Sequence, residues 1–166
     1  MKIILPFTLL LLVIMSSCQK EEERADPPCR VSYSVKQGEE KEFNGSWKFI
    51  GFQTKGGDQL EYPPCIAYDN NPNYRIIITF DGGVYTGAVL NRFEGFYTVN
   101  NDQISTGEAE VSSSLLEPSE LLSYESRLIK AIETATEFSM YYNIMTVYYG
   151  DSGESLLFEA IETGEE

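Results

Sequence analysis

Residues 80–97 read FDGGVYTGAVLNRFEGFY, and this stretch decides the fold. Its first part holds Asp81-Gly82-Gly83, and glycine tolerates the positive φ angles that a tight hairpin turn needs. Apolar and β-branched residues flank this triplet, in YRIIITF (74–80) before it and in VYTGAVL (84–90) after it. A further segment of the same kind, RFEGFYTV (92–99), follows directly. The stretch therefore predicts three antiparallel strands joined by short turns.

The strand pattern continues on both sides of this stretch. The folded domain begins near FNGSWKFIGFQT (43–54), where alternation places Trp47 and Phe49 on one face and Ile50 and Phe52 on the other. Residues 54–73 are rich in Gly, Pro, Asn and Asp, which predicts a long loop. On the other side, the triplet at 100–102 is a turn, and further strands are predicted at 103–111, 137–142, 144–149 and 155–161.

One segment departs from the strand pattern. Between residues 117 and 135 the apolar residues fall at helical spacing, at Leu121, Leu122, Leu128, Ile129 and Ile132. Pro118 suits the first turn of a helix, and Lys130 suits the C-terminal end of the helix dipole. The predicted fold class is mostly β: an antiparallel meander sheet curled into a small barrel-like domain, with one α-helix at about 118–135. Curling hides the unpaired sheet edges.

The central stretch resembles the core signature of META/HslJ-like domains. The matching positions are Phe80, Asp81, Gly82, Gly87, Asn91, Phe93, Gly95 and Tyr97. Trp47 in the first strand, and the late helix followed by a strand pair, extend the likeness over residues 43–162. The resemblance implies the family's fold and an envelope setting, and it carries over no catalytic residue. The opening Gly45-Ser46-Trp47 is shared with lipocalin-like small barrels, which remain the alternative.

The first residues resemble a bacterial lipoprotein signal. Lys2 precedes an almost wholly apolar run at 3–15, which is shorter than the about 20 residues of a membrane-spanning helix. Two serines then lead to Cys18. The resemblance implies that residues 1–17 are removed as a signal peptide and that Cys18 carries lipid. The alternative is a secretory peptide that is cut elsewhere.

An acidic cluster lies directly behind this cysteine. Its residues resemble the lipoprotein export signal of Bacteroidetes-type bacteria: Gln19, Lys20, Glu21, Glu22 and Glu23. The resemblance implies a lipid anchor in the outer membrane and display on the cell surface, with a periplasm-facing anchor as the alternative. Residues 18–42 are predicted to be the lipidated cysteine and a tether, within which RVSYSV (30–35) alternates like a short strand. Residues 163–166 form a short tail.

Two further cysteines remain, Cys29 and Cys65. Each follows a Pro-Pro pair, which predicts a stiff, extended segment. An exported protein meets conditions that permit disulfides, so we predict a Cys29–Cys65 bond. It would fasten the N-terminal segment to the long loop and, on the entropic model, would stabilise the fold by about 3–4 kcal/mol. The alternative is two free thiols.

Composition bears on the chemistry. Without residues 1–17 there are 149 residues, with 11 basic and 26 acidic side chains and a formal charge of −15. This balance argues against nucleic-acid binding, because phosphate contacts need clustered Lys and Arg. The sequence has no histidine and no close cysteine pair, so neither a Ser-His or Cys-His dyad nor a metal site is expected. We predict a non-enzymatic protein without a cofactor.

Aromatic residues give the remaining clue to function. The chain has 11 Tyr, 9 Phe and 1 Trp, and alternation predicts that the strand pair at 137–149 turns some tyrosines outward. The predicted interaction patch comprises Tyr141, Tyr142, Tyr148 and Tyr149. Exposed aromatic side chains favour contact with a protein or a glycan, of the envelope or of a host. The sequence thus predicts a binding or structural module, with a lipocalin-like carrier of a small apolar ligand as the alternative.

Overall fold

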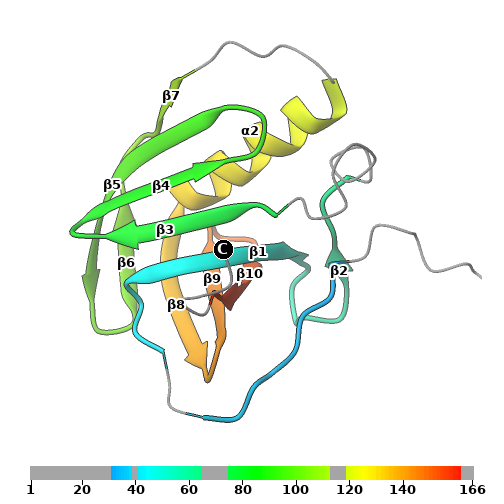
Figure 1. Ribbon diagram of the computed structural model, residues 1–166, viewed down its shortest axis with the longest axis vertical. Helices are drawn as coiled ribbons and strands as arrows, with labels where there is room; N and C mark the ends of the chain where they lie inside the picture. Colours follow the sequence, from blue (N-terminus) through cyan, green and yellow to red (C-terminus); the bar gives the residue numbers. More distant parts are fainter. Residues whose placement is uncertain (1–30, 39–40, 65–74, 113–118, 162–166) are drawn as a thin grey trace, which may run out of the picture.

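Eight strands close into an antiparallel barrel, which Figure 1 shows from the side. The computed structural model describes residues 31–38, 41–64, 75–112 and 119–161. The barrel strands are β1 (Gly45–Gln53), β3 (Ile77–Asp81), β4 (Val84–Ala88), β5 (Arg92–Asn100), β6 (Gln103–Thr106), β8 (Ala135–Tyr141), β9 (Ile144–Tyr149) and β10 (Glu154–Ala160). Two short strands attach to it, β2 (Leu60–Glu61) beside β1 and β7 (Glu110–Ser112) beside β5. The predicted fold class is therefore confirmed.

The closing seam joins the first barrel strand to the last. β1 pairs antiparallel with β10, from Trp47 opposite Ala160 to Gln53 opposite Ser155. Closure leaves the barrel strands with no free edge, so main-chain hydrogen bonds bind each strand on both sides. Asp81-Gly82-Gly83 makes the β3–β4 turn as predicted, and Gly82 and Gly83 have φ angles of 56° and 85°.

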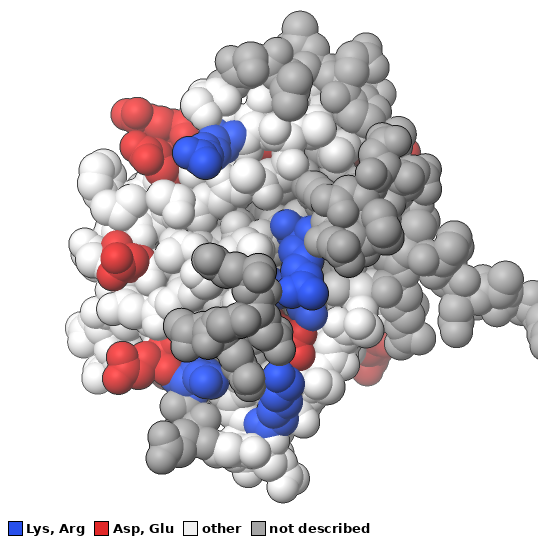
Figure 2. Space-filling model, in the orientation of Figure 1, with Lys and Arg blue, Asp and Glu red and all other residues white. Residues whose placement is uncertain are grey.

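Charged side chains are spread over the outside of the barrel. On the face shown in Figure 2, acidic and basic side chains lie in several small, separate groups with uncharged surface between them. Along β5 the alternation is regular, with Arg92 and Glu94 exposed and Phe93 and Gly95 buried. No single-sign field dominates this face, although the chain as a whole carries a formal charge of −14.

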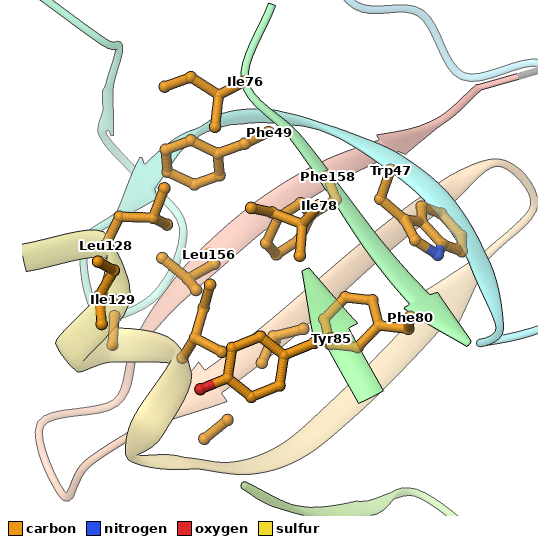
Figure 3. Close-up of a cluster of buried hydrophobic side chains, with 14 of the residues drawn as sticks. Trp47, Phe49, Ile76, Ile78, Phe80, Tyr85, Leu128, Ile129, Leu156 and Phe158 are labelled. Atoms are coloured by element: carbon orange, nitrogen blue, oxygen red, sulfur yellow. The ribbon is translucent and has the colours of Figure 1, made fainter. Parts of the chain in front are cut away.

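The barrel interior is filled by large side chains from strands on all sides. In Figure 3, side chains from β1, β3, β4, β10 and the helix converge on one cluster. Trp47, Phe49, Phe80 and Tyr85 are each at most 1% exposed. Burying an aromatic or large aliphatic side chain contributes about 1.5–3 kcal/mol, so each member of this cluster stabilises the fold substantially. Small barrels of about eight strands are generally just wide enough to be filled in this way.

One facing prediction in β1 is wrong. Simple alternation places Phe52 opposite Phe49, but both side chains lie in the interior, where their ring centroids are 5.4 Å apart. The register against β10 shifts between Phe49 and Gly51, so Ile50 is the extra residue of a β-bulge. Ile50 instead packs outside the barrel, against Ile144 and Leu157. The bulge returns the next aromatic residue to the core.

The helix α2 (Ser119–Glu133) lies across one end of the barrel (Figure 1). It packs its apolar face on the interior through Leu121, Leu128 and Ile132. Its hydrogen bonds reach the β4–β5 corner at Asn91 and the segment after β6 at Ala109. The described part of the predicted helix thus forms, and it caps the barrel. Within the described ranges no helix is both long and apolar enough to span a membrane.

Phe43 occupies the opposite end of the barrel. Its ring centroid lies 4.7 Å from that of Phe80, 5.5 Å from that of Tyr97 and 4.6 Å from that of Phe138. The main-chain oxygen of Phe43 also accepts a hydrogen bond from Trp47 Nε1 at 2.9 Å. With α2 across one end and Phe43 in the other, side chains occupy the interior from end to end.

Candidate interaction surface

The two signature glycines inside strands allow close packing. A Cβ atom on Gly95 would lie 2.4 Å from the ring of Tyr85, and one on Gly87 would lie 2.5 Å from Ile78 Cδ1. Neither glycine has a positive φ angle, so space rather than backbone conformation excludes a larger residue. The hydroxyl of Tyr85 passes over Gly95 and donates a hydrogen bond to the main-chain oxygen of Gly107 at 3.0 Å.

Asn91 is buried at the β4–β5 corner and is bound by the helix. Glu125 Oε1 accepts hydrogen bonds from the main-chain N–H groups of Leu90 and Asn91, at 2.9 and 2.7 Å. Glu125 Oε2 accepts a third from Asn91 Nδ2 at 2.7 Å. Glu125 is not among the residues predicted from the sequence, although its position in the helix is informative. It lies four residues after Leu121 and three before Leu128, inside the apolar stripe of the helix.

The other signature residues also have structural roles. Phe80, Phe93 and Tyr97 are buried in the core, and the Tyr97 hydroxyl donates to Asn44 Oδ1 at 2.6 Å. Asp81 and Gly82 belong to the β3–β4 turn. All eight signature positions thus pack the core or shape a turn.

Two of the four predicted tyrosines meet at the hairpin between β8 and β9. We call Tyr141–Ile144 the hairpin tip. The ring centroids of Tyr141 and Tyr142 are 4.6 Å apart with an interplanar angle of 60°, and Tyr141 is 60% exposed. Tyr142 has a φ angle of 56°, in the left-handed region that an aromatic residue rarely adopts. Such strain costs about 1–2 kcal/mol, and residues that keep it often serve a function.

The other two tyrosines lie on β9, at the end of the strand that is far from the hairpin tip. Tyr148 lies four positions after Ile144, the first residue of β9, which corresponds to about 13 Å at the usual rise of a strand. Tyr148 is 37% exposed, whereas Tyr149 is half-buried and faces Phe52 near the helix. Burial raises the pKa of Tyr149, and the nearby Glu154 carboxylate raises it further. The four tyrosines therefore form two groups rather than one patch.

A strongly exposed aromatic residue that is not among the predicted surface residues lies on β5. Phe96 is 73% exposed, the largest exposed fraction among the large apolar side chains that the structure describes. Its place between Gly95 and Tyr97 on an alternating strand was the available signal. Single exposed apolar side chains are common on protein surfaces, so Phe96 serves best as a comparison for the paired tyrosines.

Residues 31–38 run along the outside of the barrel, and we call them the strap (Figure 1). Part of the predicted tether, 18–42, is therefore attached to the domain. Val31 packs beside the small outer cluster of Ile50, Ile144 and Leu157. The alternating piece RVSYSV does not pair as a strand in its described part, because a closed barrel offers it no edge.

Three barrel side chains hold the strap, and we call them the seat: Lys48, Asn143 and Glu159. Lys48 and Glu159 lie directly opposite one another across the β1–β10 seam and form an ion pair. Asn143 belongs to the hairpin tip and is 5% exposed, and Glu159 is 8% exposed. The sequence signal was one acidic and one basic residue in two otherwise largely apolar segments, SWKF and SLLFEA.

The side chains of the seat form four hydrogen bonds with main-chain atoms of the strap. Lys48 Nζ donates to the oxygen of Ser32 at 3.0 Å, and Glu159 Oε1 accepts from the N–H of Ser34 at 3.1 Å. The Asn143 amide donates to the oxygen of Ser34 at 2.9 Å and accepts from the N–H of Lys36 at 2.7 Å. The two-residue spacing is that of an extended chain whose alternate residues turn toward the barrel.

Beside the helix, Arg127 forms a polar contact between elements. Its Nη1 lies 2.7 Å from each oxygen of Glu61, and its guanidinium lies 3.9 Å from the centre of the Phe52 ring. The side chains of Arg127 and Glu61 are 42% and 57% exposed, so the ion pair contributes at most about 1 kcal/mol. It joins α2 to β2 and needs no ligand to explain it.

The predicted lipidation and disulfide sites lie outside the described residues. This applies to Cys18, to the export signal at Gln19, Lys20, Glu21, Glu22 and Glu23, and to both Cys29 and Cys65. The signal peptide 1–17 and the tail 163–166 lie outside them as well. Among the residues that the structure does describe, no three His, Cys, Asp or Glu side chains gather in a group that could hold a metal ion.

Comparisons with known proteins concern the fold. No protein-family model matches the chain, and no curated protein matches it. A DUF4847 family protein from Bacteroides vulgatus superimposes with a TM-score of 0.51 at 17% identity, over 72% of this chain and 94% of that one. An NMR structure of a protein from Burkholderia xenovorans gives a TM-score of 0.54 at 16% identity, over 83% and 100% of the two chains. At these identities the likeness extends to the fold alone.

Proposed function

We propose that the chain is a non-enzymatic lipoprotein of the outer membrane, displayed on the cell surface, whose META/HslJ-like barrel is a binding module. The proposed location rests on three features of the sequence: a short apolar run, Cys18 as the lipid attachment point, and the acidic cluster at 19–23 as the export signal. A single acyl chain anchors only weakly, so stable anchoring requires a cysteine that carries more than one.

The observation that supports binding by the outer surface is the tyrosine pair of the hairpin tip. Tyr141 and Tyr142 contact one another outside a barrel whose interior is filled by aromatic side chains. Aromatic side chains contribute large contact areas to interfaces at a low cost in conformational entropy. A filled interior favours this function over the lipocalin-like carrier, which needs an internal cavity of about 300 Å³ or more.

The absence of catalysis in this proposal rests on residue types and on the roles of the signature positions. The sequence has no histidine, and all eight signature residues pack the core or shape a turn. The partner is a macromolecule of the envelope or of a host, and the scattered surface charge and the excess of acidic residues argue against a nucleic acid.

Protease shaving of intact cells tests the proposed location on the cell surface. The full chain, expressed in a Bacteroidetes host, should be released by protease from intact cells. Replacing Lys20–Glu23 with alanine should leave the protein in the membrane fraction but protect it from the protease. Equal release of both proteins would contradict the export signal, and no release of either would favour the periplasm-facing anchor.

Cross-linking on the same cells tests the binding surface. A membrane-impermeant cross-linker should join the full chain to a partner, and the paired change Tyr141→Ser and Tyr142→Ser should reduce the adduct at least tenfold. Phe96→Ser removes an even more exposed ring elsewhere on the barrel and should leave the adduct unchanged. Equal loss in both variants would contradict a role specific to the hairpin tip.

A further inference from the structure

The seat binds an extended chain by its main chain and makes little use of side chains. Its hydrogen bonds go to main-chain atoms of Ser32, Ser34 and Lys36. Residues 32–38 of the strap are all exposed, including Tyr33 at 41% and Val35 at 49%. Apart from the apolar contact of Val31, the described hydrogen bonds between strap and seat therefore use strap groups that any extended polypeptide carries.

The same contacts show why the seat requires an occupant. Asn143 and Glu159 are almost fully buried beneath the strap. If the strap left, Glu159 would keep Lys48, but the Asn143 amide would lose its two hydrogen bonds to the strap. Water can satisfy these groups in part, but an extended main chain satisfies both the donor and the acceptor at their existing spacing.

From these observations we propose that the seat is a binding site for an extended peptide segment of a partner protein, and that the strap fills it until a partner displaces it. Recognition resembles strand addition, in which main-chain hydrogen bonds supply the affinity. Because the barrel has no free edge, side chains of the seat take the place of an edge strand. This inference rests on the proposed binding function and specifies its partner: an extended polypeptide bound next to the hairpin tip.

The strap also limits when binding occurs. It competes from within the same chain at a high effective concentration, so a free peptide meets an occupied seat. Substitutions that weaken the strap without touching the seat should therefore increase binding in trans. The double change Ser34→Pro and Lys36→Pro removes the two main-chain N–H groups that donate hydrogen bonds to Glu159 and Asn143. It leaves all three residues of the seat in place.

Fluorescence anisotropy on the full chain tests the proposal, with a labelled synthetic peptide of residues 30–38 as the probe. The double-proline variant should bind the peptide saturably and at least tenfold more tightly than the unchanged chain. N-methylation of the peptide at Ser34 and Lys36 should weaken binding at least tenfold. N-methylation at Tyr33 and Val35, whose N–H groups do not bond to the seat, is the matched control and should change it less than threefold.

The outcomes separate this proposal from the proposed function. No saturable binding to the double-proline variant, or equal effects of the two methylation patterns, would overturn the peptide site. Strap exchange between two copies, seen as a stable dimer of the unchanged chain by light scattering, would replace the partner peptide by a second copy and would also overturn it. If the peptide does not bind but the cell-surface adduct still forms, the peptide site is wrong and the proposed binding function is unaffected. Peptide binding without a cell-surface adduct would instead count against the proposed function.

Discussion

Glu125 in the helix and Asn91 at the β4–β5 corner form a buried pair in which one carboxylate accepts hydrogen bonds from both the main chain and the side chain of the asparagine. The two residues are 2% and 4% exposed, so water does not replace these bonds in the folded state. The pair explains the signature asparagine as the point at which the helix is fixed to the sheet.

A double substitution tests this pair. Asn91→Asp alone places a second carboxylate beside Glu125 and should lower the free energy of unfolding by about 3 kcal/mol. Glu125→Gln alone leaves two amide donors facing one another and should cost about 1–2 kcal/mol. Together the two changes restore a donor opposite an acceptor. The double variant should therefore be at least about 1 kcal/mol more stable than the sum of the two single effects predicts. Urea unfolding measures all three.

Glu120→Gln is the matched control, because Glu120 is exposed on the same helix. It should change the free energy of unfolding by less than about 0.5 kcal/mol, alone or combined with Asn91→Asp. Strict additivity of Glu125→Gln and Asn91→Asp would show that the contact does not couple the helix to the corner.

Gly95→Ala should lower the stability by about 1–3 kcal/mol, because the new methyl group overlaps the ring of Tyr85. Gly107→Ala meets only the oxygen of Phe96, at 3.8 Å, and should change the stability by less than about 0.5 kcal/mol. Thermal unfolding of the two variants compares the sites. Equal losses of stability in the two variants would contradict the view that the Tyr85 ring requires a glycine at position 95.

Tyr142→Gly relieves the left-handed strain of the hairpin tip but removes a ring contact with Tyr141. The two effects nearly offset, so the free energy of unfolding should stay equal or rise by up to about 1 kcal/mol, while the cell-surface adduct falls. Tyr142→Val, which is β-branched, should be less stable than the glycine variant by about 1–2 kcal/mol. The reverse order in chemical denaturation would contradict the strain.

Stability should fall at high pH through Tyr85. Burial, together with the charge of Glu133, raises the pKa of Tyr85 from 10.0 to about 12 in the folded protein. The neutral hydroxyl is favoured by folding, so its contribution is complete below pH 10 and is lost as the pH rises toward 12, by about 2–3 kcal/mol. Urea unfolding at pH 8, 10 and 11.5 measures the loss.

Tyr85→Phe is the control for this titration. It removes the ionisable group and also the hydrogen bond to Gly107, so it should cost about 1 kcal/mol at pH 8 and give a shallower fall above pH 10. An identical pH dependence in the two proteins would assign the loss to other groups, such as Tyr97, whose pKa burial also raises.

Local patterns in the sequence were sufficient for the strand order and the helix. The glycine-containing turn after Phe80 and the apolar spacing from Leu121 to Ile132 predict elements that the structure contains. The face of Phe52 could not be predicted by alternation, because a bulge at Ile50 depends on pairing with β10, which is more than 100 residues away.

The candidate surface was less predictable, because its parts come together only in three dimensions. Alternation places Tyr141 and Tyr148 outward, but it does not reveal that they lie at opposite ends of the β8–β9 hairpin. The seat joins Lys48, Asn143 and Glu159 from distant parts of the chain, and the segment that it holds lies within the predicted tether. Barrel closure creates both features.

Site-specific photo-cross-linking on intact cells tests the central claim most directly, with p-benzoylphenylalanine in place of Tyr141 or, as the control, in place of Phe96. Both positions are exposed aromatic residues of the full chain, at 60% and 73%, on different parts of the barrel. A binding module that uses its hairpin tip should give a discrete adduct from position 141 and at least five times less from position 96. No adduct from position 141, or equal adducts from both positions, would contradict it.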